Sequence, residues 1–352
     1  MELINFFEEA VKSSASDIFI VAGRPISYTV GGSILTTGER LLPTNTKSII
    51  EEIYRLAERD ISLFVKTGDD DFSFAISNLG RFRVNAYMQR GSMAAVLRVV
   101  VFELPNPQTI GISDEIMSLS NMTKGLILVT GPAGSGKSTS LACLIDRINK
   151  NRECHIITLE DPLEFIHRHD KSIVSQREIH MDTQSYAKGL RAALREAPNV
   201  ILLGEMRDYE TISIAMSAAE TGQLIFSTLH TLGAANTVDR IIDVFPSSQQ
   251  QQVRVQLSMV LKAVVCQQLI PSVNGKMVPF FELMLCNNAI RTMIRDSKVH
   301  QIDSTIHSSA DQGMISMDNS IYNLYKNGII SLENALLHCL NQDSMKKKLG
   351  IN

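Results

Sequence analysis

One glycine-rich segment constrains this chain more than any other feature. Residues 131–138 read Gly-Pro-Ala-Gly-Ser-Gly-Lys-Ser and match the pattern G-x-x-x-x-G-K-[ST]. An uncharged strand-like stretch, residues 126–130, precedes the segment, and a helix-like stretch, residues 138–148, follows it. At average composition the pattern alone arises in roughly one chain in a hundred, and the strand–loop–helix context lowers that chance further. We therefore expect a parallel α/β sheet with a phosphate-binding loop.

The glycines explain why such a loop binds phosphate. They let backbone N–H groups point into the loop, and the positive end of the following helix adds to the attraction. Lys137 would bridge the β and γ phosphates, and the Ser138 hydroxyl would take a place on Mg²⁺. ATP and Mg²⁺ are thus the expected cofactors. The expected binding residues are Gly131, Pro132, Ala133, Gly134, Ser135, Gly136, Lys137, Ser138 and Thr139.

Acidic residues follow two further strand-like stretches. Glu160-Asp161-Pro162-Leu163-Glu164 comes after residues 155–159, and Glu205 comes after residues 199–204. Because loops at the carboxyl ends of parallel strands meet at one edge of the sheet, acids in both places can reach the γ-phosphate. His230 follows a fourth such stretch, residues 224–228. We expect it to sense the γ-phosphate or to couple it to the next helix.

The pattern of apolar, polar and proline residues along the chain predicts two domains. Residues 1–103 read as a small α+β domain, with a hairpin at Gly31-Gly32, a turn at 78–80 and a strand over 92–102. Residues 104–112 form the expected linker, because two prolines in 104–107 forbid a regular element. Residues 113–352 form the expected P-loop domain, with a core to about 285 and a helical part over 286–352.

The pattern turns helical from Pro246 onward. Apolar residues recur there at helical spacing, which predicts one continuous helix and then a short hairpin near 268–285 with its turn at Asn274-Gly275. The apolar residues on this expected helix are Val253, Leu257, Val260, Leu261, Val264 and Val265.

Charge and cysteine content exclude several classes of protein. The 34 Lys and Arg residues against 37 Asp and Glu residues leave a net charge of −3, so the basic excess of nucleic-acid and anionic-membrane proteins is missing. No apolar run reaches the length of a membrane helix, and the first residues are acidic rather than basic. We expect a cytoplasmic chain without membrane insertion. Five cysteines without a Cys-x-x-Cys pattern argue against disulfides and a zinc knuckle.

Four segments taken together resemble a known family. Residues 131–139, 158–164, 200–208 and 227–231 are similar to the Walker A, Asp box, Walker B and His box of the secretion-type ATPases. Residues 80–85 and 289–291 resemble one branch of these, the retraction motors of type IV pili known as the PilT family. The likeness runs in the right order over nearly the whole chain.

The resemblance implies a fold, an assembly and roles for residues. It implies a PAS-like N-terminal α+β domain, a RecA-like P-loop domain with a helical C-terminal part, and a hexameric ring. Glu164 would be the general base, and Glu205 would support Mg²⁺ and water. Arginines among Arg81, Arg83, Arg90 and Arg98 would reach the phosphates, some from a neighbouring subunit. The ring would act on an inner-membrane platform protein at the cytoplasmic face and drive pilins back into the membrane, which powers twitching motility.

Three departures from the family pattern bear on these expectations. The family usually has Thr at Ala133, whose side chain points away from phosphate, so we expect little effect. Ala197 and Asn199 replace the usual acidic pair before Walker B, and we expect this to remove charge beside the site. The first histidine of the His box is Gln223 here, which leaves His230 to carry any coupling.

Alternative functions stay open. A pilus-assembly or type II secretion motor typically carries a longer N-terminal domain and a four-cysteine zinc module, and the lack of both here favours retraction. A nucleotide-binding regulatory paralogue with weak turnover is the third reading, kept open by Gln223 and Asn199. DNA translocation is disfavoured by the acidic net charge and the lack of a basic, aromatic-rich patch.

Overall fold

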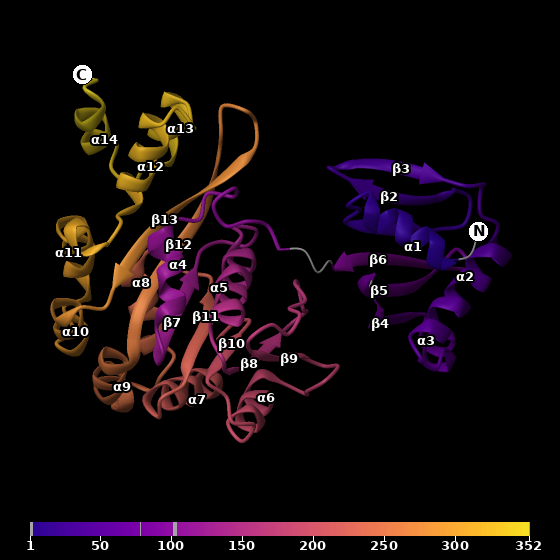
Figure 1. Ribbon diagram of the computed structural model, residues 1–352, viewed down its shortest axis with the longest axis horizontal. Coiled ribbons are helices and arrows are strands. Elements are labelled where there is room, and N and C mark those ends of the chain that lie inside the picture. Colours follow the sequence, from indigo (N-terminus) through magenta and orange to yellow (C-terminus); the bar gives the residue numbers. More distant parts are fainter. Residues whose placement is uncertain (1–2, 78, 101–103, 352) are drawn as a thin grey trace. The chain divides into compact units, whose positions relative to one another are not determined.

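The computed structural model describes residues 3–77, 79–100 and 104–351. The chain divides into two compact units. The first unit comprises Met1–Glu103 with Glu164–Ile166, and the second comprises Leu104–Leu163 with His167–Asn352. Each unit has its own sheet, labelled in Figure 1.

The first unit is an antiparallel sheet whose inner face is covered by helices. The strand order is β3-β2-β1-β6-β5-β4. Along β5 the side chains of Phe82, Val84 and Ala86 are buried and alternate with the more exposed Arg81 and Arg83, as expected for a sheet with one covered face. The strands are β1 (Asp17–Ile20), β2 (Ile26–Val30), β3 (Ser33–Thr37), β4 (Asp69–Ile76), β5 (Gly80–Gln89) and β6 (Ser92–Val100), and the helices are α1 (Leu3–Lys12), α2 (Pro43–Leu56) and α3 (Ser62–Thr67).

Aromatic packing fixes the covered face of this sheet. The ring of Phe7 on α1 lies 4.7 Å from the ring of Phe82 on β5, between their centroids. The α+β fold and the hairpin at Gly31-Gly32 are confirmed by the structure. Asn78 of the predicted turn and residues 101–102 of the predicted strand lie outside the described residues.

The second unit is built on a largely parallel sheet of strand order β13-β12-β7-β11-β10-β8-β9. The strands are β7 (Gly125–Thr130), β8 (His155–Glu160), β9 (Ile173–Glu178), β10 (Val200–Leu203), β11 (Leu224–Leu229), β12 (Leu261–Pro271) and β13 (Met277–Leu285). The helices up to β12 are α4 (Asp114–Met117), α5 (Lys137–Asn151), α6 (Tyr186–Ala193), α7 (Tyr209–Glu220), α8 (Ala234–Asp243) and α9 (Ser247–Val260). The later helices are α10 (Asn288–Arg295), α11 (Ile302–Ser308), α12 (Met317–Lys326), α13 (Leu332–His338) and α14 (Gln342–Leu349), with short 3₁₀ turns at Ser118–Asn121, Val299–Gln301 and Ala310–Gln312.

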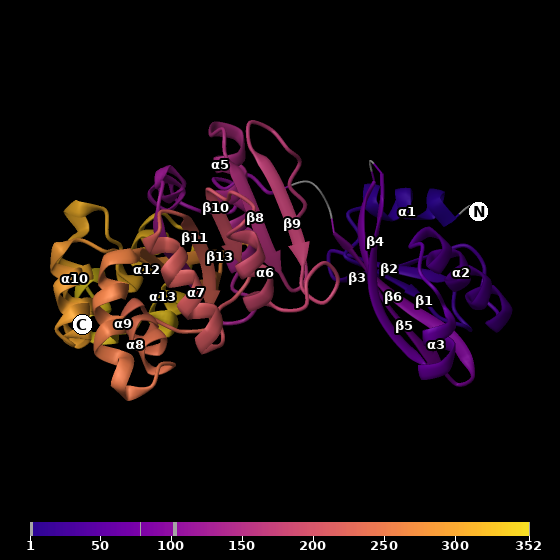
Figure 2. The same cartoon turned by 90° about the horizontal axis from the view of Figure 1, so that it is seen from below.

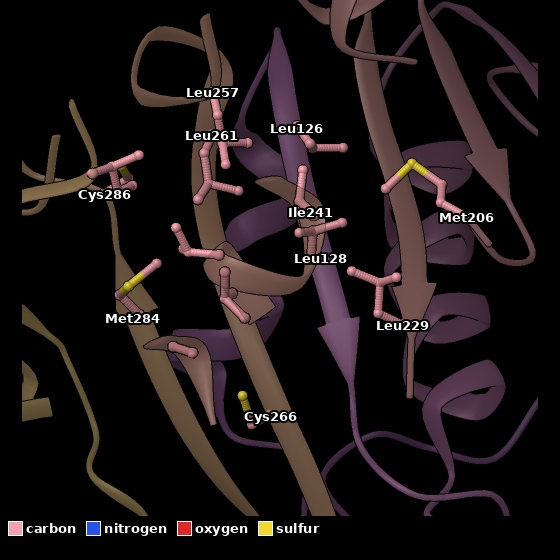
Figure 3. Packing of buried hydrophobic residues seen from close by; sticks show 14 of the residues in the cluster. Leu126, Leu128, Met206, Leu229, Ile241, Leu257, Leu261, Cys266, Met284 and Cys286 are labelled. Atoms are coloured by element: carbon pink, nitrogen blue, oxygen red, sulfur yellow. The ribbon is translucent and has the colours of Figure 1, made fainter. Parts of the chain in front are cut away.

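Both faces of this sheet are buried, which is why its strands read as unbroken apolar runs. On one face Ile127 and Val129 of β7 pack with residues of α5. On the other face Leu126 and Leu128 pack with residues of α7, α8 and α9. Figures 1 and 2 show α5 and the α7–α9 group on opposite faces, and Figure 3 shows Leu128 beside Ile241 of α8.

The continuous helix predicted from Pro246 is wrong in its second half. Helix α9 ends at Val260, and Leu261, Val264 and Val265 lie on β12. The hairpin is therefore longer than predicted and begins at Leu261. β12 pairs with both β7 and β13, so its side chains are buried on both faces. The spacing of such a short apolar run fits a buried strand and a buried helix equally well. The run is a strand here because it pairs with the edge of β7.

A buried ion pair holds α2, the following turn and β4 of the first unit together. The Asp70 carboxylate accepts two hydrogen bonds from the Arg59 guanidinium, both 2.8 Å, and a third of 2.9 Å from the Tyr54 hydroxyl. Burial alone would raise the pKa of Asp70, but the hydrogen bonds from Arg59 and Tyr54 outweigh it, so the pKa of this carboxyl is lowered.

We expect Asp70→Asn to destabilise the chain by about 1.5–3 kcal/mol, the range for hydrogen bonds to charged groups, because Arg59 keeps only weaker partners. The lower end applies since the Arg59 side chain is 32% exposed and partly screened. Urea unfolding of the full chain measures the loss. Glu51→Gln is the matched control, because it breaks only the exposed pair with Lys47 and should cost less than about 0.5 kcal/mol.

The lowered pKa of Asp70 also makes the stability of the folded chain depend on pH. Since the pKa of Asp70 is lower in the folded than in the unfolded chain, its stabilisation is complete above the unfolded pKa of about 4. The stabilisation is lost as the pH falls through the folded pKa. The Asn variant should therefore lose less stability on acidification than the wild type, and an identical acid limb in both proteins would contradict this account.

Candidate active site

The glycine-rich loop lies between β7 and α5, as the sequence predicts. Gly131, Gly134 and Gly136 have φ angles of +140°, +74° and +86°, a region that side chains rarely adopt. A Cβ on Gly131 would lie 2.1 Å from the backbone oxygen of Gln267, so no larger residue fits there. The backbone of the loop therefore lies directly against the backbone of β12, with no room for a side chain between them.

The lysine of the loop folds back over it. The ammonium Nζ of Lys137 donates hydrogen bonds of 2.9 Å to the carbonyls of Gly131 and Pro132, and its side chain is largely buried. The Ser135 hydroxyl is buried and has no hydrogen-bond partner in the described part of the chain. A cradle of glycines with a cation across it and an unpartnered buried hydroxyl fits a bound phosphate chain. The residues present thus fit a nucleotide.

Gln267 supports this loop and was missed by the sequence reasoning. Its side-chain oxygen accepts a hydrogen bond of 2.7 Å from Ser140 of α5, and its Nε2 lies 2.9 Å from where a Gly136 Cβ would stand. In the sequence, two adjacent glutamines end the apolar run shortly after Val265. Because that run was predicted to be a helix, Gln267 was not expected beside the loop. Only a strand at β12 places it there.

Glu205 is held between two basic side chains beyond the end of β10. Its Oε2 lies 2.7 Å from Nε of Arg207 and 3.6 Å from Nε2 of His230, and the Glu205 side chain is only 18% exposed. Arg207 follows Glu205 by two positions in the chain and is the nearer of its two partners. His230 follows β11, so two neighbouring strands deliver these groups to one point.

A cavity of about 430 Å³ opens beside these groups. Glu205 and His230 line it together with Arg207, Arg240 and Thr231. The Thr228 hydroxyl donates a 2.6 Å hydrogen bond to the carbonyl of Gly204, which ties the end of β11 to the end of β10. The carboxyl edge of the sheet thus presents an acid, a histidine and arginines next to open space.

The acids at the end of β8 lie at the same edge of the sheet. Glu160 is the last residue of β8 and is partly buried, and Asp161 follows it and is exposed. Glu164 is also exposed, and its contacts group it with the first unit. β8 is the neighbour of β10, and both run parallel to β7. Three inter-strand steps separate β8 from β7, or about 14 Å, which a triphosphate and a loop side chain can span together.

The segment after His230 connects the site to α8. The hydroxyl of Thr231 lies 2.7 Å from the hydroxyl of Thr237 on α8. The first backbone N–H of α8, at Ala234, donates a 2.8 Å hydrogen bond to Glu282 of β13, a buried acid whose pKa is raised by burial. Glu282 was missed by the sequence reasoning, although a lone acid within the apolar run 280–285 was a visible signal.

The predicted arginines of the first unit occupy two places. Arg83 and Arg98 face each other across β5 and β6, and Arg98 lies 3.1 Å from Asp17. Arg81 shares their strand face and donates a 2.6 Å hydrogen bond to Ser73. Arg90 lies in the turn after β5, about nine residues or 30 Å along the strand from Arg81. The structure thus gathers three of the four arginines and leaves Arg90 at the far end.

The expectation that Ala197 and Asn199 alter charge beside the site is wrong. Both precede β10 and lie at the amino edge of the sheet, where the Asn199 side chain accepts a hydrogen bond of 2.9 Å from the backbone of His155. Gln223 likewise precedes β11 and pairs with Thr221. The predicted active-site groups follow the carboxyl ends of these strands, at the opposite edge of the sheet. Ala197, Asn199 and Gln223 therefore lie a strand length away from them.

Three further properties concern the described residues. No group of three His, Cys, Asp or Glu side chains among them could bind a metal ion by itself. All five cysteines are free thiols. Within the described ranges, no helix has the length and apolar character needed to cross a bilayer.

Comparison with known proteins adds relatives of named function. The chain is 41% identical over 318 residues to a Pseudomonas aeruginosa protein named "Type IV pilus retractation ATPase PilT", covering 89% of this chain and 91% of that one. It is 46% identical over 248 residues to a Neisseria gonorrhoeae "Twitching motility protein", covering 70% and 66%.

A solved structure matches over nearly the whole chain. The crystal structure titled "Pilus Retraction Motor PilT and Bound ADP" has a TM-score of 0.89 and 42% identity, covering 99% of each chain. This match confirms the predicted fold class, a PAS-like N-terminal domain with a RecA-like P-loop domain. The family model described as "Type II/IV secretion system protein" matches residues 2–325. The chain therefore belongs to the type II/IV secretion system protein family.

Proposed function

We propose that this chain is an ATP-hydrolysing motor that powers retraction of type IV pili. The observation that carries the proposal is the carboxyl edge of the second sheet, where the phosphate loop follows β7, His230 follows β11, and Glu205 with its partner Arg207 follows β10. The identity to PilT over most of both chains supports retraction as the work that the hydrolysis drives.

The loop residues bind and orient the nucleotide. Backbone N–H groups of residues 131–136 and the start of α5 hold the phosphates, and Lys137 exchanges its carbonyl contacts for phosphate oxygens. Ser138 and, through water, Glu205 would hold Mg²⁺, which would supply positive charge to offset that of the phosphates.

Two acids share the work on the attacking water. Glu164 is the general base, since it is an exposed carboxylate in the segment that follows β8. Glu205 orients water and metal, because Arg207 and His230 keep its carboxylate fixed. His230 passes the presence of the γ-phosphate to α8 through the contact of Thr231 with Thr237.

The active site is completed in a homohexameric ring. Charge that develops on the γ-phosphoryl group calls for an arginine, and Arg81, Arg83 and Arg98 lie on one strand face of the first unit. These arginines act on the nucleotide of a neighbouring subunit. The ring works at the cytoplasmic face of the inner membrane on a platform protein, and moves pilins indirectly through it.

We expect Glu164→Gln to keep nucleotide binding and to lose turnover by about 10²–10⁴-fold, the contribution of a positioned base. A steady-state ATPase assay and a titration with labelled nucleotide measure the two properties. Glu153→Gln is the matched control, because Glu153 is also exposed but precedes β8 at the opposite edge of the sheet. Near-normal turnover of the Glu164 variant would move the base role to Glu160 or Glu205.

Mixed rings test the arginines in trans. A chain with Arg81→Ala and Arg83→Ala is mixed with a chain carrying Lys137→Ala, each inactive alone. If the arginines act across the subunit interface, mixed rings should regain part of the turnover where an intact loop meets intact arginines. An Arg90→Ala chain serves as control and should be active alone, since Arg90 lies in a turn at the far end of β5. Verified mixed rings without recovery would contradict the assignment.

A pilus count tests the direction of the work. Cells lacking this chain should carry an excess of pili that do not retract, and a Glu164→Gln chain should fail to restore twitching. Cells without pili would instead support an assembly motor, and normal pili with normal twitching would support a regulatory role.

A further inference from the structure

Tyr186 stands at the start of α6 in a position that its neighbours fix. The Ser185 hydroxyl accepts a hydrogen bond of 3.3 Å from the backbone of Lys188 and begins the helix there. A Cβ on Gly189 would lie 3.1 Å from a methyl group of Leu159, so α6 lies directly against β8. The helix start and the helix–strand contact together set where the Tyr186 side chain leaves the backbone.

The phenol oxygen of Tyr186 lies over Gly204. An ideal Cβ on Gly204 would stand 2.6 Å from that oxygen and 3.4 Å from Cα of Glu160. Gly204 does not have a positive φ, so its missing side chain is a matter of space and not of backbone conformation. In this chain the phenol fills the space above Gly204, at the junction of the ends of β8 and β10.

Burial and negative charge both act on the pKa of the phenol. Burial first, and then the charges of Glu205, Asp161 and Glu160, raise the pKa of Tyr186 well above its ordinary value. The hydroxyl therefore keeps its proton and is a hydrogen-bond donor over the whole physiological pH range. It makes no hydrogen bond to any residue that the structure describes.

We propose that Tyr186 is a positioning residue of the nucleotide site, whose hydroxyl donates a hydrogen bond to a water held by Glu205. This inference rests on the proposed ATP hydrolysis. The donor has a fixed place between β8, which leads to Glu164, and β10, which leads to Glu205. A phenol over Gly204, the residue before Glu205, orients water through its O–H without taking or giving a proton in the reaction.

The alternative is that the ring only packs, in which case its oxygen is dispensable. Phenylalanine separates the two cases because it keeps the ring and removes the donor. We expect Tyr186→Phe to lower kcat about 10-fold, the worth of one hydrogen bond to a charged neighbourhood, with KM for ATP and the thermal midpoint unchanged. Tyr209→Phe is the matched control, since its hydroxyl contacts Gln249 on an exposed surface, and it should keep wild-type kcat.

Gly204→Ala offers an independent approach to the same hydroxyl. Its new methyl group would stand 2.6 Å from the phenol oxygen and must displace it, but meets no other atom closer than 3.4 Å. We expect this variant to lower kcat about as much as Tyr186→Phe. When Gly204→Ala is added to the Tyr186→Phe chain, it should lower kcat by less than about 2-fold, because the clashing oxygen is gone.

The outcomes distinguish this inference from the function on which it rests. A 10-fold loss of kcat at constant KM, together with the non-additive double variant, supports the positioning role. Full kcat of Tyr186→Phe in a wild type that hydrolyses ATP overturns this inference alone. Equal losses from Gly204→Ala in both backgrounds overturn it as well. A wild-type chain without any turnover overturns the proposed function and this inference together.

Discussion

The parallel hydrogen bonding of β7, β11, β10 and β8 is the constraint on which the rest of the second unit depends. Parallel strands in register end at one edge, so whatever follows each strand is delivered to one place. The phosphate loop, His230, Glu205 and Glu160 follow these four strands in that spatial order. A functional edge is thus a consequence of backbone geometry, and individual side chains need only stand at the right strand ends.

Two glycines of the site let groups from distant parts of the chain come close to the backbone. Gly131 meets the carbonyl of Gln267 at a distance that leaves no room for a Cβ, and Gly204 leaves room for the phenol of Tyr186. In both places the absence of a side chain admits a group from an element distant in sequence. The phosphate loop is consequently supported by β12, and the Glu205 region by α6, so that the site is rigid where hydrolysis needs fixed distances.

The sequence predicted what depends on local patterns. The phosphate loop, the strand ends at Glu160, Glu205 and His230, and the small α+β domain of the first unit all follow from motif and alternation, and the structure contains each of them. The prediction failed at 261–265, because a short apolar run does not distinguish a buried helix from a buried strand. It failed again at Ala197 and Asn199, which are near the motifs in sequence but at the other edge of the sheet.

The sequence by itself determined the class of fold and the chemistry of the site, because glycines, a lysine and strand-end acids at fixed spacing specify a phosphate site through backbone rules alone. Only the tertiary structure decided which distant groups support that site. Gln267, Glu282 and Tyr186 come from elements that carry no motif, and their roles arise from strand order and from helix α6 lying against β8. Such contacts depend on how elements pack, and spacing along the chain does not encode that packing.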